Sequence, residues 1–190
     1  MKVNTLDPNA RFLWLDLETT GLDPEKDAIL EIAYWPSRSA DPFDLDESDQ
    51  RSFVLRHLPA HLSEKLSPFT WRMHGASGLL ADCVESSIAW WQPNDALLAL
   101  LEDKTLTWHL AGNSVHFDRS FLNNNYCKVA ERLSHRILDV SAVKMVARAM
   151  GMPHDKGEPA HRALDDVKSS VAELRACVEF FRPGSKMVAI

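Results

Sequence analysis

The chain has 190 residues and is 45% hydrophobic, so it is long enough to bury one substantial core and too short to suggest two full domains. Its net charge of −6 argues against a protein that wraps long nucleic acid through many Lys and Arg contacts, but leaves room for a short, metal-bridged substrate. No secretion signal or membrane span is evident and the three cysteines do not suggest a disulfide framework, so we expect a cytoplasmic protein without a membrane segment.

Three strands are predicted in succession in the first third of the chain. Residues 11–17 form a dense apolar run that suits a strand covered on both faces, and residues 28–34 and 51–58 predict a second and a weaker third strand. Residues 36–49 are rich in Asp, Ser and Pro, which is typical of a solvated loop. We therefore expect a meander.

Helices and strands alternate in the rest of the chain. A helical pattern begins near residue 63, and Asn94 is expected to cap the start of the helix that follows it. The order predicts an α/β fold, a mixed sheet with helices packed against it. The later elements are a helix over residues 95–102, a strand over 105–111, a helix opened by residues 112–114, a strand over 137–139, a helix over 140–150, a loop over 152–159 and a last helix from about 161 to 181.

Two carboxylates stand at the end of the first predicted strand. Asp16 and Glu18 are separated by one residue, so both side chains leave the strand from the same face. Taken alone, such a pair is often only a polar strand end. Other acids, however, occur at positions from which they could join these two in one metal site.

Those further acids lie at two predicted helices. Asp118 falls in the opening turn of the helix after the fourth strand, where free backbone N–H groups favour a carboxylate. In the last helix, Asp166 flanks the buried stripe more closely than Asp165, so we select Asp166 as the inward acid. His161 precedes it by five residues, and Pro159 favours an irregular helix start from which the imidazole could reach the same site.

These residue types suit the hydrolysis of a phosphodiester. Two divalent cations, Mg²⁺ or Mn²⁺, would neutralise the phosphoryl oxygens and stabilise the leaving alkoxide, and such hard cations prefer carboxylate oxygens. Asp16, Glu18, Asp118 and Asp166 are the predicted ligands. His161 is suited to accept the proton of the attacking water.

With these residues in the order D-x-E, D, H-x₄-D, the sequence resembles the DEDDh exonucleases and, within them, the oligoribonuclease family. The resemblance covers about residues 11–182 and implies one ribonuclease H-like exonuclease domain for the whole chain, 1–190. It implies the same four metal ligands and the same general base, His161. The segments that carry it are WLDLETTGLDPEKDAILEIA (14–33), HGASGL (74–79), AGNSVHFDRSFL (111–122), RILDVSAVKMVAR (136–148) and AHRALDDVKSSVAEL (160–174).

The resemblance also implies a substrate and an assembly. Oligoribonucleases are homodimers that degrade short single-stranded RNA, dinucleotides in particular, to 5′-mononucleotides. Leu22 would be an apolar wedge between two bases. The other implied substrate contacts are Ser114 at the 5′ phosphate, Arg136 reaching that phosphate from the partner subunit with His135 beside it, and Trp71 and His74 lining the pocket.

Three positions depart from the family pattern and leave alternatives open. Thr19 replaces a usual Met, Trp71 and His74 stand closer together, and His135 replaces a Tyr. The first alternative is a proofreading-type or short-DNA exonuclease, which the E-T-T-G segment favours. The others are a catalytically silent nucleotide-binding protein, and a metal-dependent phosphatase, which would leave His161 unexplained.

Overall fold

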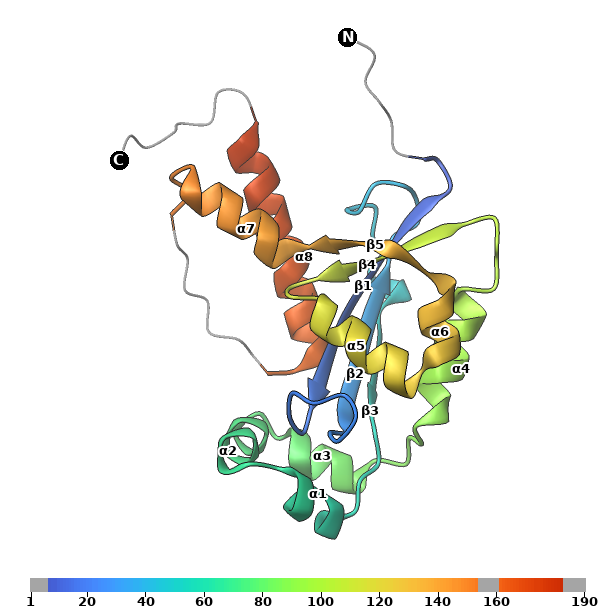
Figure 1. The fold of residues 1–190 in the computed structure, drawn as a ribbon, viewed down its shortest axis with the longest axis vertical. Helices are drawn as coiled ribbons and strands as arrows, with labels where there is room; N and C mark the ends of the chain where they lie inside the picture. The colour runs from blue at the N-terminus through green and yellow to red at the C-terminus, as the bar shows by residue number, and fades with distance from the viewer. Residues whose placement is uncertain (1–6, 154–160, 183–190) are drawn as a thin grey trace.

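A five-stranded mixed sheet forms the centre of the molecule, with helices on both faces (Figure 1). The computed structural model describes residues 7–153 and 161–182. The strand order is β3-β2-β1-β4-β5, antiparallel from β3 to β1 and parallel from β1 to β5. The strands are β1 (Ala10–Thr19), β2 (Ile29–Pro36), β3 (Arg51–Val54), β4 (Thr107–Gly112) and β5 (Leu133–Asp139).

The helices form two groups by their position relative to the sheet. Three short helices follow β3 and lie below the sheet in Figure 1, and the others flank its two faces. They are the 3₁₀ helix η1 (Glu47–Asp49), α1 (Pro59–Lys65), α2 (Pro68–Ala76), α3 (Leu79–Glu85), α4 (Trp91–Leu100), α5 (His116–Asn125), α6 (Cys127–Arg132), α7 (Val140–Ala149) and α8 (Ala163–Phe181). None of these helices is long and apolar enough to cross a membrane.

The two faces of β1 divide the core. Leu13, Leu15 and Leu17 pack toward α4, α5 and α6, in one buried cluster with Leu97 of α4. Phe12 and Trp14 point the other way and pack with residues of α7 and α8. A strand buried on both faces explains why its sequence is a continuous apolar run rather than an alternating one.

The predicted α/β fold and the meander of the first three strands are confirmed, with several differences in the bounds. The third strand ends at Val54, and Leu55 forms only an isolated bridge with Ile88. Helix α4 begins at Trp91, so Asn94 lies inside it and does not cap it, because a proline in the first turn, Pro93, is compatible with a helix.

Helix α6 and the first half of β5 were missed by the sequence-based prediction. Helix α6 has six residues, too few to show a helical period. β5 begins at Leu133 and not at residue 137, because the exposed edge-strand residues 134–136 give no apolar signal. The last helix begins at Ala163 and not at residue 161. The predicted loop over 152–159 lies mostly outside the described residues.

Cys83, Cys127 and Cys177 are free.

Candidate active site

Three carboxylates meet where β1 ends beside the first turn of α8. Asp16 and Glu18 follow Phe12 and Trp14 on the face of β1 that packs against α8, since alternate residues of a strand share a face. Asp166 joins them from the first turn of α8. One oxygen atom from each of Asp16, Glu18 and Asp166 lies within 4.8 Å of the other two. Asp165, the neighbour rejected by the helical spacing, is exposed.

The fourth predicted acid lies close to this group without being a member of it. Asp118 is buried in the first turn of α5. Its Oδ1 accepts a hydrogen bond of 3.0 Å from the backbone N–H of Leu17, the residue between Asp16 and Glu18. This bond fixes α5 against the end of β1, and the Asp118 charge helps to raise the pKa of Asp16.

Burial and crowding make it costly to ionise these carboxylates. Burial, with Asp118 and Glu18 as neighbouring charges, raises the pKa of Asp16 well above its ordinary value. Burial first, and then Asp166 and Glu31, raises the pKa of Glu18 from 4.5 to about 8. Burial also raises the pKa of Asp118 from 3.8 to about 8. A set of crowded carboxylate oxygen donors fits hard divalent cations.

His74 lies against the end of β1 and has no exposed surface. Its Nε2 donates to the backbone carbonyl of Thr19 at 2.9 Å, and its Nδ1 lies 3.7 Å from Oε2 of Glu18. Burial lowers the pKa of His74, which favours the neutral ring. The prediction that His74 lines the substrate pocket therefore needs correction, because the ring is fully buried, binds the Thr19 carbonyl and presents no surface to a substrate.

His161 precedes α8 and lies outside the group of three carboxylates. Its ring is close enough to His74 for its charge to lower the pKa of His74. Its φ of 53° is left-handed, and among the described residues Ser114, with a φ of 49°, is the one other non-glycine residue with a positive φ. Such conformations are uncommon for residues other than glycine and concentrate at functional sites.

Glu31 is a site residue that sequence reasoning missed. It lies opposite Glu18 in the β1–β2 pair and is buried. Its Oε2 accepts from Nε of Arg162 at 3.1 Å and from the backbone N–H of Ala163 at 3.2 Å, so it caps the start of α8. Arg162 also pairs with Asp82 of α3 at 2.8 Å. A glutamate inside the apolar segment AILEIAY was the available signal.

The loop after β1 presents Leu22 to solvent, with 82% of its surface exposed. Asp27 holds the loop, since its carboxylate accepts from the Thr20 hydroxyl at 3.1 Å and from the backbone N–H of Asp23 at 2.9 Å. An added Cβ at Gly21 would overlap the Asp27 carboxylate, which explains the glycine. An exposed leucine on a braced loop is available for contact with an apolar surface such as a base.

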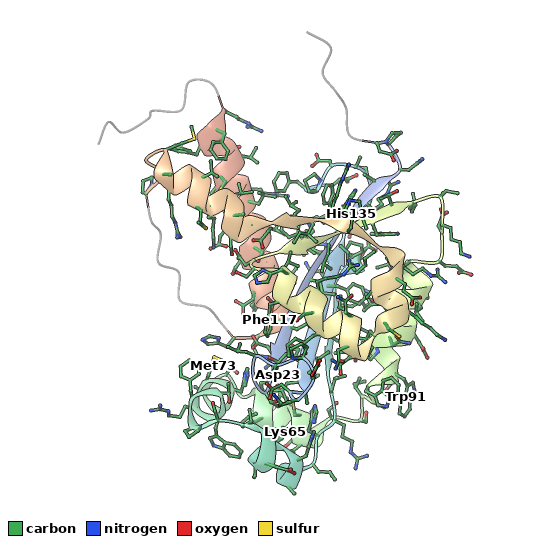
Figure 2. All side chains as sticks on the ribbon, viewed as in Figure 1. Asp23, Lys65, Met73, Trp91, Phe117 and His135 are labelled. Atoms are coloured by element: carbon green, nitrogen blue, oxygen red, sulfur yellow. The ribbon has the colours of Figure 1, made fainter. Side chains whose placement is uncertain are left out.

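A cleft of about 560 Å³ opens beside Glu18 and Leu22. Phe69 and Met73 of α2 line one part of it and Phe117 of α5 another. Figure 2 shows Met73 and Phe117 near the same end of the sheet as Asp23. These apolar side chains offer surfaces on which bases could pack beside the Glu18 carboxylate.

Trp71 does not line this cleft, contrary to the sequence-based expectation. Phe69 and Met73 are four residues apart and share one face of α2, whereas Trp71 lies between them and points away. The Trp71 ring is 46% exposed. The structure therefore separates Trp71 from the carboxylate cleft by the direction of its side chain.

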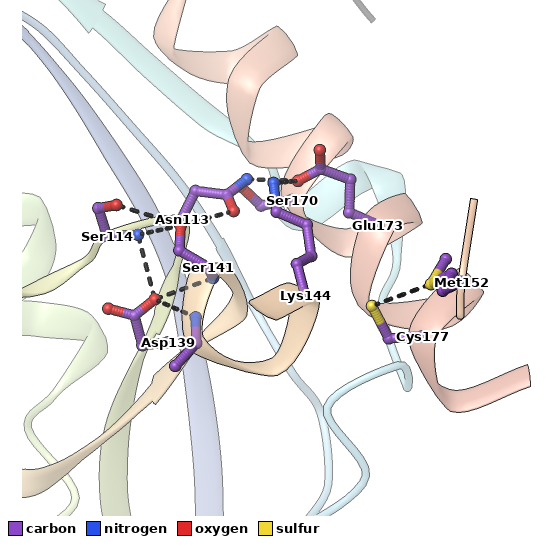
Figure 3. Close-up of polar contacts among 10 residues, drawn as sticks. Asn113, Ser114, Asp139, Ser141, Lys144, Met152, Ser170, Glu173 and Cys177 are labelled. Carbon is purple, nitrogen blue, oxygen red and sulfur yellow. Dashed lines mark hydrogen bonds and ion pairs between the residues drawn. The ribbon is translucent and has the colours of Figure 1, made fainter. Parts of the chain in front are cut away.

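Ser114 precedes α5 in the chain but lies beside the start of α7, where Asp139, the residue that caps α7, binds it. Asp139 caps α7 by accepting from the backbone N–H groups of Ser141 and Ala142, at 2.9 and 3.3 Å. The same Oδ1 accepts from the N–H of Ser114 at 3.3 Å. The Ser114 and Ser141 hydroxyls lie 3.1 Å apart (Figure 3). Two hydroxyl groups thus share one small surface.

Asn113 connects this surface to α8. Its Oδ1 accepts from the Ser141 hydroxyl at 3.2 Å, and its Nδ2 donates to Ser170 at 2.9 Å and to Glu173 at 2.6 Å (Figure 3). Lys144 binds the same Glu173 oxygen at 2.8 Å. The position of the Ser114 and Ser141 hydroxyls therefore depends on the packing of α7 against α8.

Arg136 and His135 lie on β5, the edge strand, and both are exposed. Figure 2 shows His135 toward the opposite end of the sheet from Asp23. The structure thus places these two residues on an outer edge where a second chain could contact them.

Comparisons with known proteins show which family the chain belongs to. The family described as RNase_T, exonuclease, matches residues 13–174. The mitochondrial oligoribonuclease of Mus musculus is 36% identical over 172 residues, which cover 87% of this chain and 70% of that protein. The oligoribonuclease of Corynebacterium diphtheriae is 36% identical over 182 residues, covering 90% and 84%.

Similar solved structures support the fold alone. A zinc-bound crystal structure of the E. coli ExoI complex with single-stranded DNA superposes with a TM-score of 0.69 at 17% identity. The match covers 92% of this chain and 41% of that one, so this chain spans about two fifths of the larger exonuclease.

Proposed function

The chain belongs to the RNase_T exonuclease family and, within it, to the oligoribonucleases, and from this membership we propose a 3′→5′ exoribonuclease that hydrolyses short oligoribonucleotides, dinucleotides especially, to 5′-mononucleotides. We treat residues 1–190 as one exonuclease domain with a core of about 11–182. The observation that carries the proposal is the group formed by Asp16, Glu18 and Asp166 beside a cleft lined by exposed apolar residues.

The carboxylates supply a site for divalent cations, as this exonuclease family requires. Asp16, Glu18 and Asp166, with Asp118 beside them, would hold two cations, and the proposal favours Mg²⁺ or Mn²⁺ because every donor is a carboxylate oxygen. When bound, such cations offset charge on the phosphoryl oxygens and stabilise the leaving 3′ alkoxide.

Other residues move the proton and hold the geometry. His161 takes the proton of the attacking water as general base. His74 donates a hydrogen bond to the Thr19 carbonyl and so holds the end of β1 beside the carboxylates. Leu22 inserts between the two bases of a dinucleotide and orients the scissile phosphodiester toward the carboxylates.

The 5′ end is held by a phosphate clamp. Ser114 offers a hydroxyl, and its exposed position beside Ser141 supports this role. Arg136 of one subunit, with His135 next to it, contacts the 5′ phosphate held by the other subunit in a homodimer. The exposure of Arg136 on an edge strand supports a contribution in trans, since the residue lies on the outside of its own chain.

The test is cleavage of a length series. Purified full-length chain is incubated with Mg²⁺ or Mn²⁺ and 5′-labelled RNA or DNA of two to twenty nucleotides, with a parallel series in EDTA. We expect metal-dependent release of 5′-mononucleotides, with kcat/KM highest for RNA dinucleotides. Equal rates on two and twenty nucleotides would instead identify a general or proofreading-type exonuclease. Binding without turnover would identify a catalytically silent nucleotide-binding protein.

A further inference from the structure

We propose that His57 and His61 form a second metal site, outside the carboxylate group, that binds a nitrogen-preferring divalent transition-metal ion of the Zn²⁺ or Cu²⁺ class. The two Nδ1 atoms lie 3.1 Å apart, and the rings are stacked with centroids 5.3 Å apart at 21°. This site does not rest on the exonuclease activity.

The first ring is fixed in the tautomer that a metal ligand needs. Nε2 of His57 lies 2.9 Å from the backbone carbonyl of Ile29, which can only accept, so Nε2 carries the proton. With the proton on Nε2, Nδ1 of the neutral ring presents a lone pair. A ligating histidine typically donates its other N–H to such a carbonyl. The backbone N–H of His57 also binds the Cys83 carbonyl at 2.9 Å.

The second nitrogen completes a chelating pair. His61 lies in α1 (Pro59–Lys65), one helical turn beyond His57, and its Nδ1 faces the lone pair of His57. Because two facing lone pairs at 3.1 Å would repel each other, either a proton carried by the His61 ring or a metal ion lies between the two nitrogen atoms. A tetrahedral ion about 2.0–2.1 Å from each nitrogen holds the two atoms roughly 3.3–3.4 Å apart, so binding requires the two rings to separate slightly and to turn until both lone pairs point at the ion.

The surroundings leave space for the remaining ligands. Both rings line a pocket of about 480 Å³ that Arg56, Trp90 and Tyr126 also border. Two protein nitrogen atoms fill only part of a coordination shell, and the pocket has room for water or a small anion, which Arg56 would favour. Imidazole prefers Zn²⁺, Cu²⁺ and Ni²⁺ to the hard cations that suit carboxylates, so the two sites select different metals.

The test compares metal binding by the full chain and by two variants. Zn²⁺ affinity is measured by competition with a chromophoric chelator in excess Mg²⁺, and Cu²⁺ ligation by nitrogen couplings in the EPR spectrum. We expect His61→Ala to weaken one Zn²⁺ site at least about 10–100-fold, the usual effect of even an outer-shell change, and to remove the coupling of one imidazole. His116→Ala, which removes an exposed histidine of α5, is the matched control and should change neither.

His61 lies near the surface in a short helix, so its variant is expected to fold, and circular dichroism checks this. His57→Ala would also remove the bond to Ile29 and is not needed. Unchanged Zn²⁺ affinities and unchanged Cu²⁺ couplings in folded His61→Ala would overturn the proposal and leave a shared proton between the rings. Loss of nuclease activity in any variant bears on the exonuclease proposal alone.

Discussion

Glu18 and Glu31 lie directly opposite each other in the antiparallel pair β1–β2, on the sheet face that α8 covers. Glu31 is bound by Arg162 at 3.1 Å, whereas Glu18 faces Asp16 and Asp166. One member of a like-charged pair is therefore neutralised within the chain. Glu18, by contrast, belongs to a group of carboxylates whose ionised form would be stabilised by cations from solution.

The first prediction concerns the stability of the metal-free protein. The pKa of Glu18 is raised from 4.5 to about 8, mainly by burial, so between these values the folded state binds more protons than the unfolded chain. The free energy of unfolding should therefore fall as pH rises through this range. Glu18→Gln should unfold at a higher urea concentration than the parent at pH 8 in EDTA, and lose this advantage at pH 5.

Glu25→Gln, at an exposed position of the loop after β1, is the control and should change neither midpoint. Addition of Mg²⁺ should stabilise the parent more than Glu18→Gln, because the cation offsets a charge that the variant lacks. Equal midpoints for the parent and Glu18→Gln at pH 8 would show that folding does not raise the pKa of Glu18.

The second prediction separates two adjacent acids. Asp166→Ala should reduce kcat below detection while the fold is retained, because it removes one of three converging oxygen ligands. Asp165→Ala should keep near-parental kcat, since that side chain is exposed. The measurement is dinucleotide turnover at saturating Mn²⁺. If Asp166→Ala stays active, Asp166 is not a ligand.

The third prediction tests the general base. His161→Ala should slow hydrolysis by about 10²–10⁴-fold, the usual contribution of a general base, with little change in substrate affinity. The acidic limb of the parental rate profile, where activity rises with pH, should disappear in the variant. Persistence of that limb would assign it to another titrating group.

The fourth prediction tests the role of Asn113 in placing the hydroxyl pair. Asn113→Ala removes hydrogen bonds to Ser141, Ser170 and Glu173. We expect KM for a 5′-phosphorylated dinucleotide to rise about tenfold, an effect on the scale of one or two hydrogen bonds, with a smaller change in kcat. A dinucleotide without the 5′ phosphate should show little change. Equal losses on both substrates would indicate a general structural effect.

The fifth prediction asks whether Arg136 acts in trans. Arg136→Ala and Asp118→Ala subunits should each be poorly active as homodimers. Mixing them should restore part of the activity, because one site of the heterodimer then combines Asp118 of one chain with Arg136 of the other. Sedimentation should show a dimer. An active monomer, or no recovery after subunit exchange, would rule out the clamp across subunits.

Local periodicity determined much of the site before any fold was known. A strand repeats every two residues, so the sequence alone places Asp16 and Glu18 on one face, and a helix repeats every 3.6, so it favours Asp166 over Asp165. The structure brings these three carboxylates together. The successive strands of the meander were predictable for the same reason, since each carries its own apolar pattern.

The tertiary structure alone decided the contacts between elements far apart in sequence. The pairing of Glu18 with Glu31, the hydrogen bond of His74 to Thr19 and the salt bridge of Arg162 to Glu31 each depend on strand register or helix placement. The period of a segment determines which residues share a face, but not which other element packs against that face. Which buried polar group satisfies which partner is therefore settled only when the chain packs.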